Sequence, residues 1–207
     1  MNSLILGIDP GLTRCGYGLV QRNQRRELEY LSSGVLLSDK DEALQDRLLI
    51  IGEGVAALMD THHPVAISLE RVFSQQNLHS VMSIAQISGV ILYEAAKRNI
   101  PVVLYTPTQV KAAVSGYGKA EKKQVATMVS RILRLNDFVV PADESDALAL
   151  AICHLHQSPL GALQVPAAAQ QQTNTVKPTD LRSTQPRTAL TPAQEKWLAA
   201  ERQSKAK

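Results

Sequence analysis

Four acidic side chains stand where carboxylates are unusual, at the ends of apolar segments. Asp9 follows the apolar run LILGI, and Glu70 ends the apolar segment VAISLE. Asp143 and Asp146 lie three residues apart in PADESDALALAI, so they share one face if this segment is helical. Ionised carboxylates are rarely buried without a partner that compensates their charge. For Asp9 that partner is an arginine, a cluster of backbone amides or a metal ion.

Convergence of the four carboxylates would require a counter-charge, because they cannot all remain ionised side by side. Divalent cations with oxygen ligands, above all Mg²⁺, supply that charge. Two such ions about 3.5–4 Å apart activate water and stabilise the leaving oxygen in phosphodiester hydrolysis. Taken singly, the acids have plainer explanations: Asp9 as a turn residue, and Asp143 and Asp146 as helix-start residues favoured by the helix dipole. The prediction of a metal site therefore depends on the combination.

The elements that must position these acids follow from the hydrophobic periodicity. Strand-like segments lie at 4–9, 16–23, 28–37, 65–73 and 101–107. Helical spacing of apolar residues is found at 41–60, 77–98, 107–115, 121–134 and 141–156. Three antiparallel strands followed by alternating helices and strands predict an α/β fold, a five-stranded mixed sheet flanked by helices. If the first and fourth strands are neighbours, Asp9 and Glu70 project from the same edge, and a helix start packed there adds the other two acids.

Composition divides the chain into a folded domain at 1–157 and a tail at 158–207. The tail is rich in Ala, Gln, Thr and Pro and carries seven Lys and Arg against three Asp and Glu, so residues 1–157 are slightly acidic. We expect a low-complexity, mostly disordered basic tail. A short helix is favoured at 191–203, where Thr191 is suited to the N-cap, Pro192 to the first turn and Gln194 to the capping box.

The cellular setting is predicted from what the sequence lacks. Cys15 and Cys153 show no disulfide framework spacing, which fits a reducing compartment. The N-terminal apolar run is too short for a signal peptide. The uncharged stretch 72–93 is interrupted by Gln, Asn, His and Ser, so it is not expected to cross a membrane. These features predict a cytoplasmic protein that makes no membrane contact.

A local basic patch predicts contact with nucleic acid, although the domain as a whole is not basic. Within residues 111–134, six basic side chains face only Glu121: Lys111, Lys119, Lys122, Lys123, Arg131 and Arg134. The segment SGYGKAEKK places amides, glycines and lysines at a helix start, which suits phosphate contact. The alternative is a solvated basic loop.

Four motifs together resemble the RuvC-type crossover (Holliday) junction endodeoxyribonucleases. They are GIDPGLTRCGYGLV, LERVF, QVKAAVSGYGKAEKKQV and PADESDALALAICHLH, and the resemblance covers about residues 3–157. It implies an RNase H-like fold and a homodimer that uses Mg²⁺ to cut four-way DNA junctions symmetrically, in homologous recombination and DNA repair. It also implies two metal ions per site, with Mn²⁺ as a substitute, and partnership with the RuvA–RuvB branch-migration complex.

The resemblance assigns roles to individual residues. The four metal-binding catalytic carboxylates would be Asp9, Glu70, Asp143 and Asp146. Lys111 and Lys122 match important basic positions of the family near the DNA, and Phe73 matches the aromatic residue at the junction centre. Beside these, Lys119 and Lys123 of the basic segment and Arg71 are further candidates for DNA contact. From the residues alone, Phe73 is either a core side chain or a base-stacking one.

Two positions depart from the family pattern. Arg71 follows the catalytic glutamate, where Gln or another polar residue is common. The sequence Gln86-Ile87-Ser88-Gly89 stands where the family often has Gln-Ala-Arg-Gly. Any contact made by that missing arginine is therefore in question, whereas the expected metal chemistry is unaffected.

The helix expected at 77–98 is apolar on nearly all sides, which indicates that two of its faces are buried. One face can cover the sheet. The other face is buried either against a second copy of the chain in a two-fold dimer or entirely within the monomer under other helices.

Two other functions compete with the nuclease. Asp9-Pro10-Gly11-Leu12-Thr13 also resembles the phosphate motif of actin-like ATPases and sugar kinases, but those enzymes need a second domain and a second glycine-rich loop, and this chain has neither. A non-catalytic DNA-binding relative with the same fold is the other alternative, and the complete set of four carboxylates argues against it.

Overall fold

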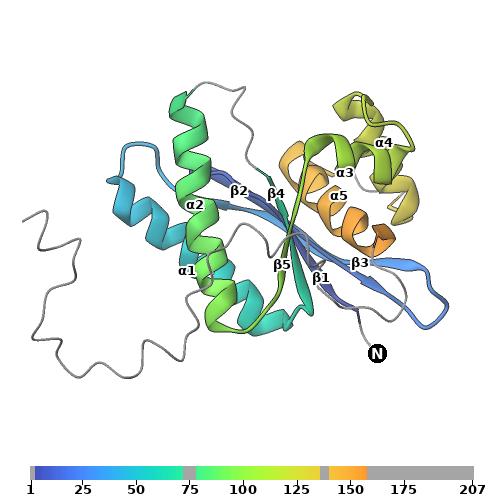
Figure 1. Cartoon of the computed structure of the whole chain (residues 1–207), viewed down its shortest axis with the longest axis horizontal. Helices are drawn as coiled ribbons and strands as arrows, with labels where there is room; N and C mark the ends of the chain where they lie inside the picture. The colour runs from blue at the N-terminus through green and yellow to red at the C-terminus, as the bar shows by residue number, and fades with distance from the viewer. Residues whose placement is uncertain (1–2, 72–77, 136–139, 158–207) are drawn as a thin grey trace, which may run out of the picture. The chain divides into compact units, whose positions relative to one another are not determined.

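The computed structural model describes residues 3–71, 78–135 and 140–157, and its elements alternate much as the periodicity predicts (Figure 1). The strands are β1 (Ile5–Asp9), β2 (Arg14–Arg22), β3 (Leu28–Leu37), β4 (Ala66–Glu70) and β5 (Val102–Tyr105). The helices are α1 (Leu44–His62), α2 (Leu78–Lys97), α3 (Pro107–Ser115), α4 (Lys122–Ile132) and α5 (Ala142–Gln157).

The five strands form one mixed sheet in the order β3-β2-β1-β4-β5. The pairs β1–β2 and β2–β3 are antiparallel, whereas β1–β4 and β4–β5 are parallel. This confirms the predicted fold class, and it confirms that the first and fourth strands are neighbours. Asp9 and Glu70 are the last residues of β1 and β4, so both lie at the carboxyl edge of the parallel part of the sheet.

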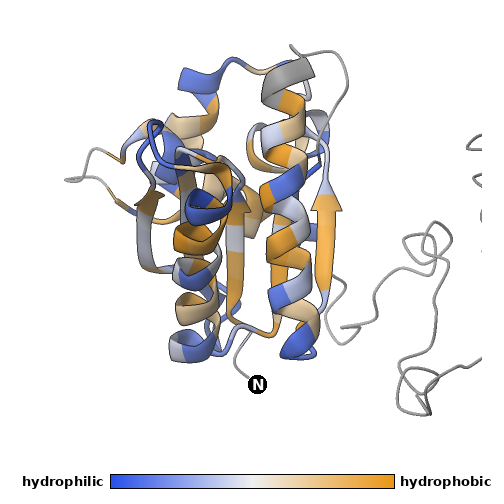
Figure 2. Cartoon of the chain, turned by 90° about the vertical axis from the view of Figure 1, so that its left-hand side faces the viewer, coloured by the Kyte–Doolittle hydropathy of each residue, from blue (hydrophilic) through white to orange (hydrophobic). Residues whose placement is uncertain are grey.

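Alternation along the strands divides the core into two layers. Leu6, Ile8 and Leu69 belong to the apolar cluster on the side of α1 and α2. Ile5 and Tyr105 belong to the other cluster, with residues of α3, α4 and α5. Figure 2 shows the strands coloured mainly as hydrophobic, in agreement with a sheet that is covered on both faces. Asp9 shares its side of β1 with Ile5, so it faces the layer of α3, α4 and α5.

Helix α5 approaches the sheet unusually closely because three glycines lie beneath it. A Cβ atom on Gly7 would stand 2.0 Å from the carbonyl oxygen of Ala147, and one on Gly16 would stand 2.3 Å from that of Asp143. A Cβ on Gly18 would be 2.8 Å from the backbone nitrogen of Leu148. Only glycine permits such backbone contact, so these positions fix the start of α5 beside the end of β1.

The observed element bounds differ from the predicted ones at a few ends. Helix α1 begins at Leu44 rather than at 41, because Asp39 first closes a turn by accepting a hydrogen bond from the backbone N–H of Asp41. Strand β2 begins two residues early, at Arg14, since that residue still pairs with Leu37 of β3.

Helix α2 is not fully buried within the chain that the structure describes, so that alternative is wrong. Ile87 and Ile91 are buried against the sheet layer, whereas Met82 and Tyr93 are 58% and 64% exposed. The predicted disordered tail with its helix at 191–203, as well as Phe73, lies outside the described residues. Among the helices described, none has the length and apolar character needed to span a membrane.

Candidate active site

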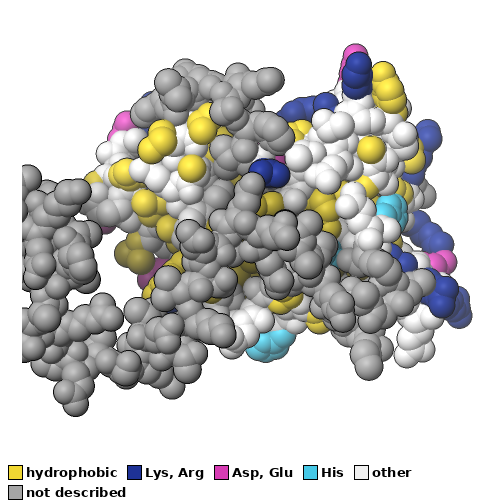
Figure 3. Space-filling model, in the orientation of Figure 1, with side chains coloured by type: hydrophobic (Ala, Val, Ile, Leu, Met, Phe, Trp, Pro, Cys, Tyr) yellow, Lys and Arg dark blue, Asp and Glu magenta, His cyan; other side chains and the backbone are white. Residues whose placement is uncertain are grey.

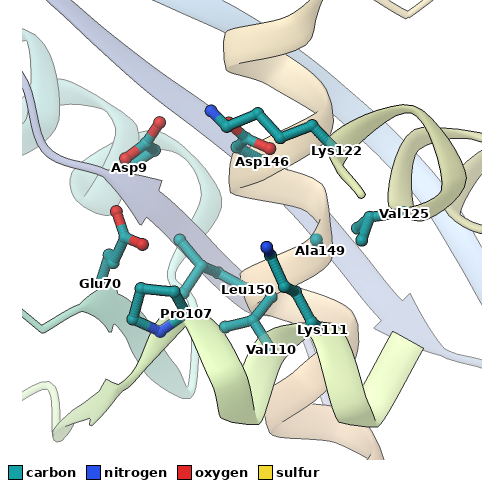
Figure 4. Close-up of a pocket in the computed structure, with 10 residues that line it drawn as sticks. All are labelled: Asp9, Glu70, Pro107, Val110, Lys111, Lys122, Val125, Asp146, Ala149 and Leu150. Atoms are coloured by element: carbon teal, nitrogen blue, oxygen red, sulfur yellow. The ribbon is translucent and has the colours of Figure 1, made fainter. Parts of the chain in front are cut away.

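A pocket of about 290 Å³ opens at the carboxyl ends of β1 and β4, where α3, α4 and α5 converge on the sheet (Figure 4). Three acids line it, one each from β1, β4 and α5, together with two lysines from α3 and α4. Apolar side chains complete its wall. The lining residues are Asp9, Glu70, Pro107, Val110, Lys111, Lys122, Val125, Asp146, Ala149 and Leu150.

The Asp9 and Glu70 carboxyl groups are hydrogen bonded to each other. Burial raises the pKa of Asp9 to about 7, and the negative charges of Glu70 and Asp146 add to this rise. Burial also raises the pKa of Glu70. A carboxyl group whose pKa is raised in this way would release its proton when a cation binds beside it.

Asp146 reaches the pocket from the second turn of α5, where it meets a lysine from the start of α4. The Nζ of Lys122 donates to Oδ2 of Asp146 at 2.9 Å, and this hydrogen bond raises the pKa of Lys122. The Lys122 side chain is 80% exposed. An ammonium group therefore supplies part of the counter-charge that the acids require.

Asp143 is not among the residues that line the pocket. Its Oδ2 accepts a hydrogen bond from Nε of Arg14 at 2.7 Å and forms an ion pair with Nη2 of the same guanidinium, also at 2.7 Å. Asp143 and Asp146 therefore share the first turns of α5 as predicted, but their carboxylates have different partners. Sequence reasoning missed Arg14. The sequence pattern that could have revealed it is the alternation of Arg14, Gly16 and Gly18 on one face of β2. The two glycines leave room for a helix, and the arginine precedes them on the same face.

The expected DNA-binding residues occupy different places around the site. Lys111 and Lys122 line the pocket, and Lys111 projects into it from α3 (Figure 4). Lys119 and Lys123 are exposed and do not line it. Arg71 is exposed next to Glu70, and its backbone N–H donates to Tyr105 of β5.

The donor atoms at this edge fit a hard divalent ion, because they are carboxylate oxygens from three elements. Among the residues that the structure describes, no three His, Cys, Asp or Glu side chains are grouped as a ready-made metal site. These acids already have partners within the chain: Lys122 pairs with Asp146, Arg14 pairs with Asp143, and Asp9 is hydrogen bonded to Glu70. Lys122 and Arg14 thus offset two of the four carboxylate charges.

Comparison with known proteins gives the family. The family model described as crossover junction endodeoxyribonuclease RuvC matches residues 5–154. The curated relative of that name from Leifsonia xyli subsp. xyli is 47% identical over 202 residues, which cover 98% of this chain and 93% of the relative.

Two solved structures resemble the chain over about three quarters of its length. RuvC from Thermus thermophilus is 31% identical, with a TM-score of 0.68, and covers 74% of this chain and 93% of its own. The structure of T. thermophilus RuvC in complex with a Holliday junction substrate is 32% identical, with a TM-score of 0.69, and covers 73% of this chain and 92% of its own. The chain belongs to the RuvC family of crossover junction endodeoxyribonucleases.

Proposed function

We propose that this protein is a structure-selective endonuclease that resolves four-way (Holliday) DNA junctions by paired, symmetric phosphodiester hydrolysis. This activity serves homologous recombination and DNA repair. The observation that carries the proposal is the meeting of Asp9, Glu70 and Asp146 with Lys111 and Lys122 in one pocket of a RuvC-family chain. Family membership favours this activity over the ATPase alternative.

The carboxylates would hold two catalytic ions in each active site. These ions would be Mg²⁺, and Mn²⁺ would be able to replace them. Asp9, Glu70 and Asp146 face the pocket, and Asp143 would join them from its rim. Bound divalent ions supply counter-charge and Lewis-acid activation of the hydrolysis. Ionised carboxylates are the better ligands, so the raised pKa values of Asp9 and Glu70 predict that ion binding strengthens as the pH rises.

The two lysines would act on the phosphate rather than on the metal. Lys111 and Lys122 point toward the pocket from different helices, so one scissile phosphate can meet both ammonium groups (Figure 4). Positive charge held in this position stabilises the negative charge that develops on the phosphate oxygens. Lys119, Lys123, Arg71 and Phe73 would contact the DNA outside the pocket, where they position the strand.

The substitution Asp146→Asn tests the proposal. It removes a pocket charge at nearly constant volume, so the variant is expected to bind a synthetic four-way junction while losing cleavage in Mg²⁺ by about 100-fold or more. Asp41→Asn is the matched control, because Asp41 is an exposed acid in the turn before α1.

Paired nicks at symmetric positions on denaturing gels are expected for the wild type and for Asp41→Asn. Undiminished cleavage by Asp146→Asn would refute the assignment of the acids. A wild-type protein that shifts the junction on a native gel and leaves every strand intact would instead support the non-catalytic alternative.

We also propose that the enzyme is a homodimer that associates through the outer faces of α1 and α2. Large apolar side chains are exposed there: Leu49, Ile50, Met82, Leu92 and Tyr93. Figure 3 shows hydrophobic side chains gathered over α2. A two-fold dimer buries the same surface on both copies, and it presents two active sites to a junction of approximate two-fold symmetry.

Sedimentation of the full chain tests this interface. We expect the wild type to be a dimer, Leu92→Glu to be a monomer because it places a charge in an apolar contact, and Leu37→Glu to remain a dimer. Leu37 is the matched control, an exposed leucine on β3 at the other side of the sheet. A monomeric wild type, or a Leu92→Glu variant as dimeric as the control, would contradict the proposal.

The cellular context follows from the same activity. Resolution of junctions requires access to chromosomal DNA, so we propose a cytoplasmic location and a functional partnership with the RuvA–RuvB branch-migration complex. Co-sedimentation of the chain with junction-bound RuvA and RuvB tests the proposed partnership. The absence of binding to that complex, under conditions in which the chain binds the naked junction, would contradict it.

A further inference from the structure

Arg14 is placed by β2 at the open end of α5. It lies on the same face of the strand as Gly16 and Gly18, because side chains two residues apart share a face. Those glycines lie beneath Asp143 and Leu148 of α5, so Arg14 extends past the start of the helix. Its Nε and Nη2 there meet Oδ2 of Asp143, each at 2.7 Å.

Asp143 stands close to the pocket that it does not line. Its backbone carbonyl lies over Gly16, and Gly16 is the residue of β2 that pairs directly with Asp9 of β1. Gly16 lies one strand spacing, about 5 Å, from Asp9, so Asp143 stands in the helix layer above the strand next to a pocket acid. The direction of its side chain, toward Arg14, is what keeps its carboxylate at the rim.

The pair is open to solvent, with Arg14 56% and Asp143 35% exposed. An exposed ion pair is weak, so a divalent cation that offers Asp143 a stronger partner can displace the guanidinium. A neighbouring arginine provides the contrast. Arg47 donates to Thr13 Oγ1 and to Ser38 Oγ, neither of which is a carboxylate, so it brings similar charge to the same end of the sheet without holding an acid.

We infer that Arg14 is a positioning residue that holds Asp143 outside the pocket and competes with the divalent ion for its carboxylate. The inference deepens the proposed function and rests on it, since it takes Asp143 as a ligand of the catalytic site. Arg14 thereby lowers the affinity of the DNA-free enzyme for the ion.

Binding of Mn²⁺ to the DNA-free full chain tests this, with the free-ion signal followed by electron paramagnetic resonance at constant ionic strength. We expect Arg14→Gln to bind Mn²⁺ about threefold more tightly than the wild type, which is the effect of removing an exposed competitor. Arg14→Lys keeps the positive charge, and its affinity for Mn²⁺ is expected to lie between those of the wild type and Arg14→Gln. Arg47→Gln is the matched control for local positive charge, and its affinity is expected to change by less than half as much.

The variant Asp143→Asn separates failure of the inference from failure of the proposed function. In the double variant Arg14→Gln/Asp143→Asn the gain from losing Arg14 is expected to disappear. If Asp143→Asn alone binds Mn²⁺ like the wild type, the role of Asp143 as a ligand fails, and the inference fails with it. If Asp143→Asn binds weakly while Arg14→Gln binds no more tightly than Arg47→Gln, only the inference is overturned.

Discussion

The two faces of the sheet are covered by helices in different ways. On one face, α1 and α2 pack through large apolar side chains such as Ile51, Met59 and Ile87. On the other face, α5 lies with its backbone against β1 and β2, separated from them only by glycine hydrogens at Gly7 and Gly16. Side-chain packing allows small rearrangements, whereas backbone contact does not.

This difference suits the location proposed for the active site. Asp146 of α5 lines one pocket with Asp9 of β1 and Glu70 of β4, and contact through glycine holds the backbone of α5 at a fixed distance from the sheet. The face of α1 and α2 has no such requirement, and its outer surface is free to carry the exposed apolar residues proposed for dimer formation. The predictions below test this contrast between a rigid face and an adaptable one.

The largest effect is expected from Gly7→Val on the rigid face. The new Cβ would lie 2.0 Å from the carbonyl of Ala147, and backbone cannot move aside as a side chain can. We expect the free energy of unfolding, measured in urea, to fall by about 3 kcal/mol or more.

Gly89→Ala is the control on the other face, because a Cβ there meets nothing within 4 Å. In a helix interior this change is expected to stabilise by up to about 1 kcal/mol. Equal losses in both variants would show that α5 is not held more rigidly than α2.

An intermediate effect is expected from Asp9→Asn in the absence of divalent ions. The pKa of Asp9 is raised to about 7 in the folded chain from 3.8, so ionisation of Asp9 destabilises the fold as pH rises from about 4 to 7. Removal of that charge is expected to raise the free energy of unfolding at pH 8 by about 2 kcal/mol, and the gain should vanish at low pH.

Thermal unfolding of both proteins between pH 4 and 8 measures this gain. Mg²⁺ is expected to stabilise the wild type at pH 8 and to stabilise Asp9→Asn less, because the variant has lost a ligand. A variant that is no more stable than the wild type at pH 8 would show that the pocket tolerates its charges without a cation.

The smallest effects are expected from two buried serines, one on each face. Ser68 Oγ donates to the carbonyl of Leu150 in α5 at 2.7 Å, whereas Ser88 Oγ in α2 has no hydrogen-bond partner among the described residues. Ser68→Ala is expected to lower the free energy of unfolding by about 1 kcal/mol, and Ser88→Ala to raise it by a similar amount. Urea unfolding compares them, and a stabilising Ser68→Ala would contradict the role given to this contact.

Local patterns were sufficient for most of the fold. The alternation in β1 and β4 and the helical spacing in α1 and α2 depend on neighbours along the chain, so they were readable from the sequence. The ends of the helices and strands were harder to predict. A turn at Asp39 makes α1 begin later than predicted, and cross-strand pairing with Leu37 makes β2 begin earlier. Such ends are set by competing hydrogen bonds rather than by periodicity.

The candidate site was predicted in its composition but not in its pairing. Asp9 and Glu70 were recognisable as charges that end apolar strands, and Asp146 as an acid on the first turns of a helix. The sequence did not reveal that Asp143 turns to Arg14 instead of the pocket, because 129 residues separate the two partners. Residue spacing within one helix says which side chains share a face, and it does not say which charge lies opposite them.

The sequence by itself determined the strands, the helices, the family and the acids available for chemistry, because each of these is written in residue types and local spacing. The tertiary structure alone decided which acids share one pocket, which cations neutralise them and how closely α5 approaches the sheet. Electrostatic partners are chosen by distance in space. That distance is fixed only when remote segments pack together.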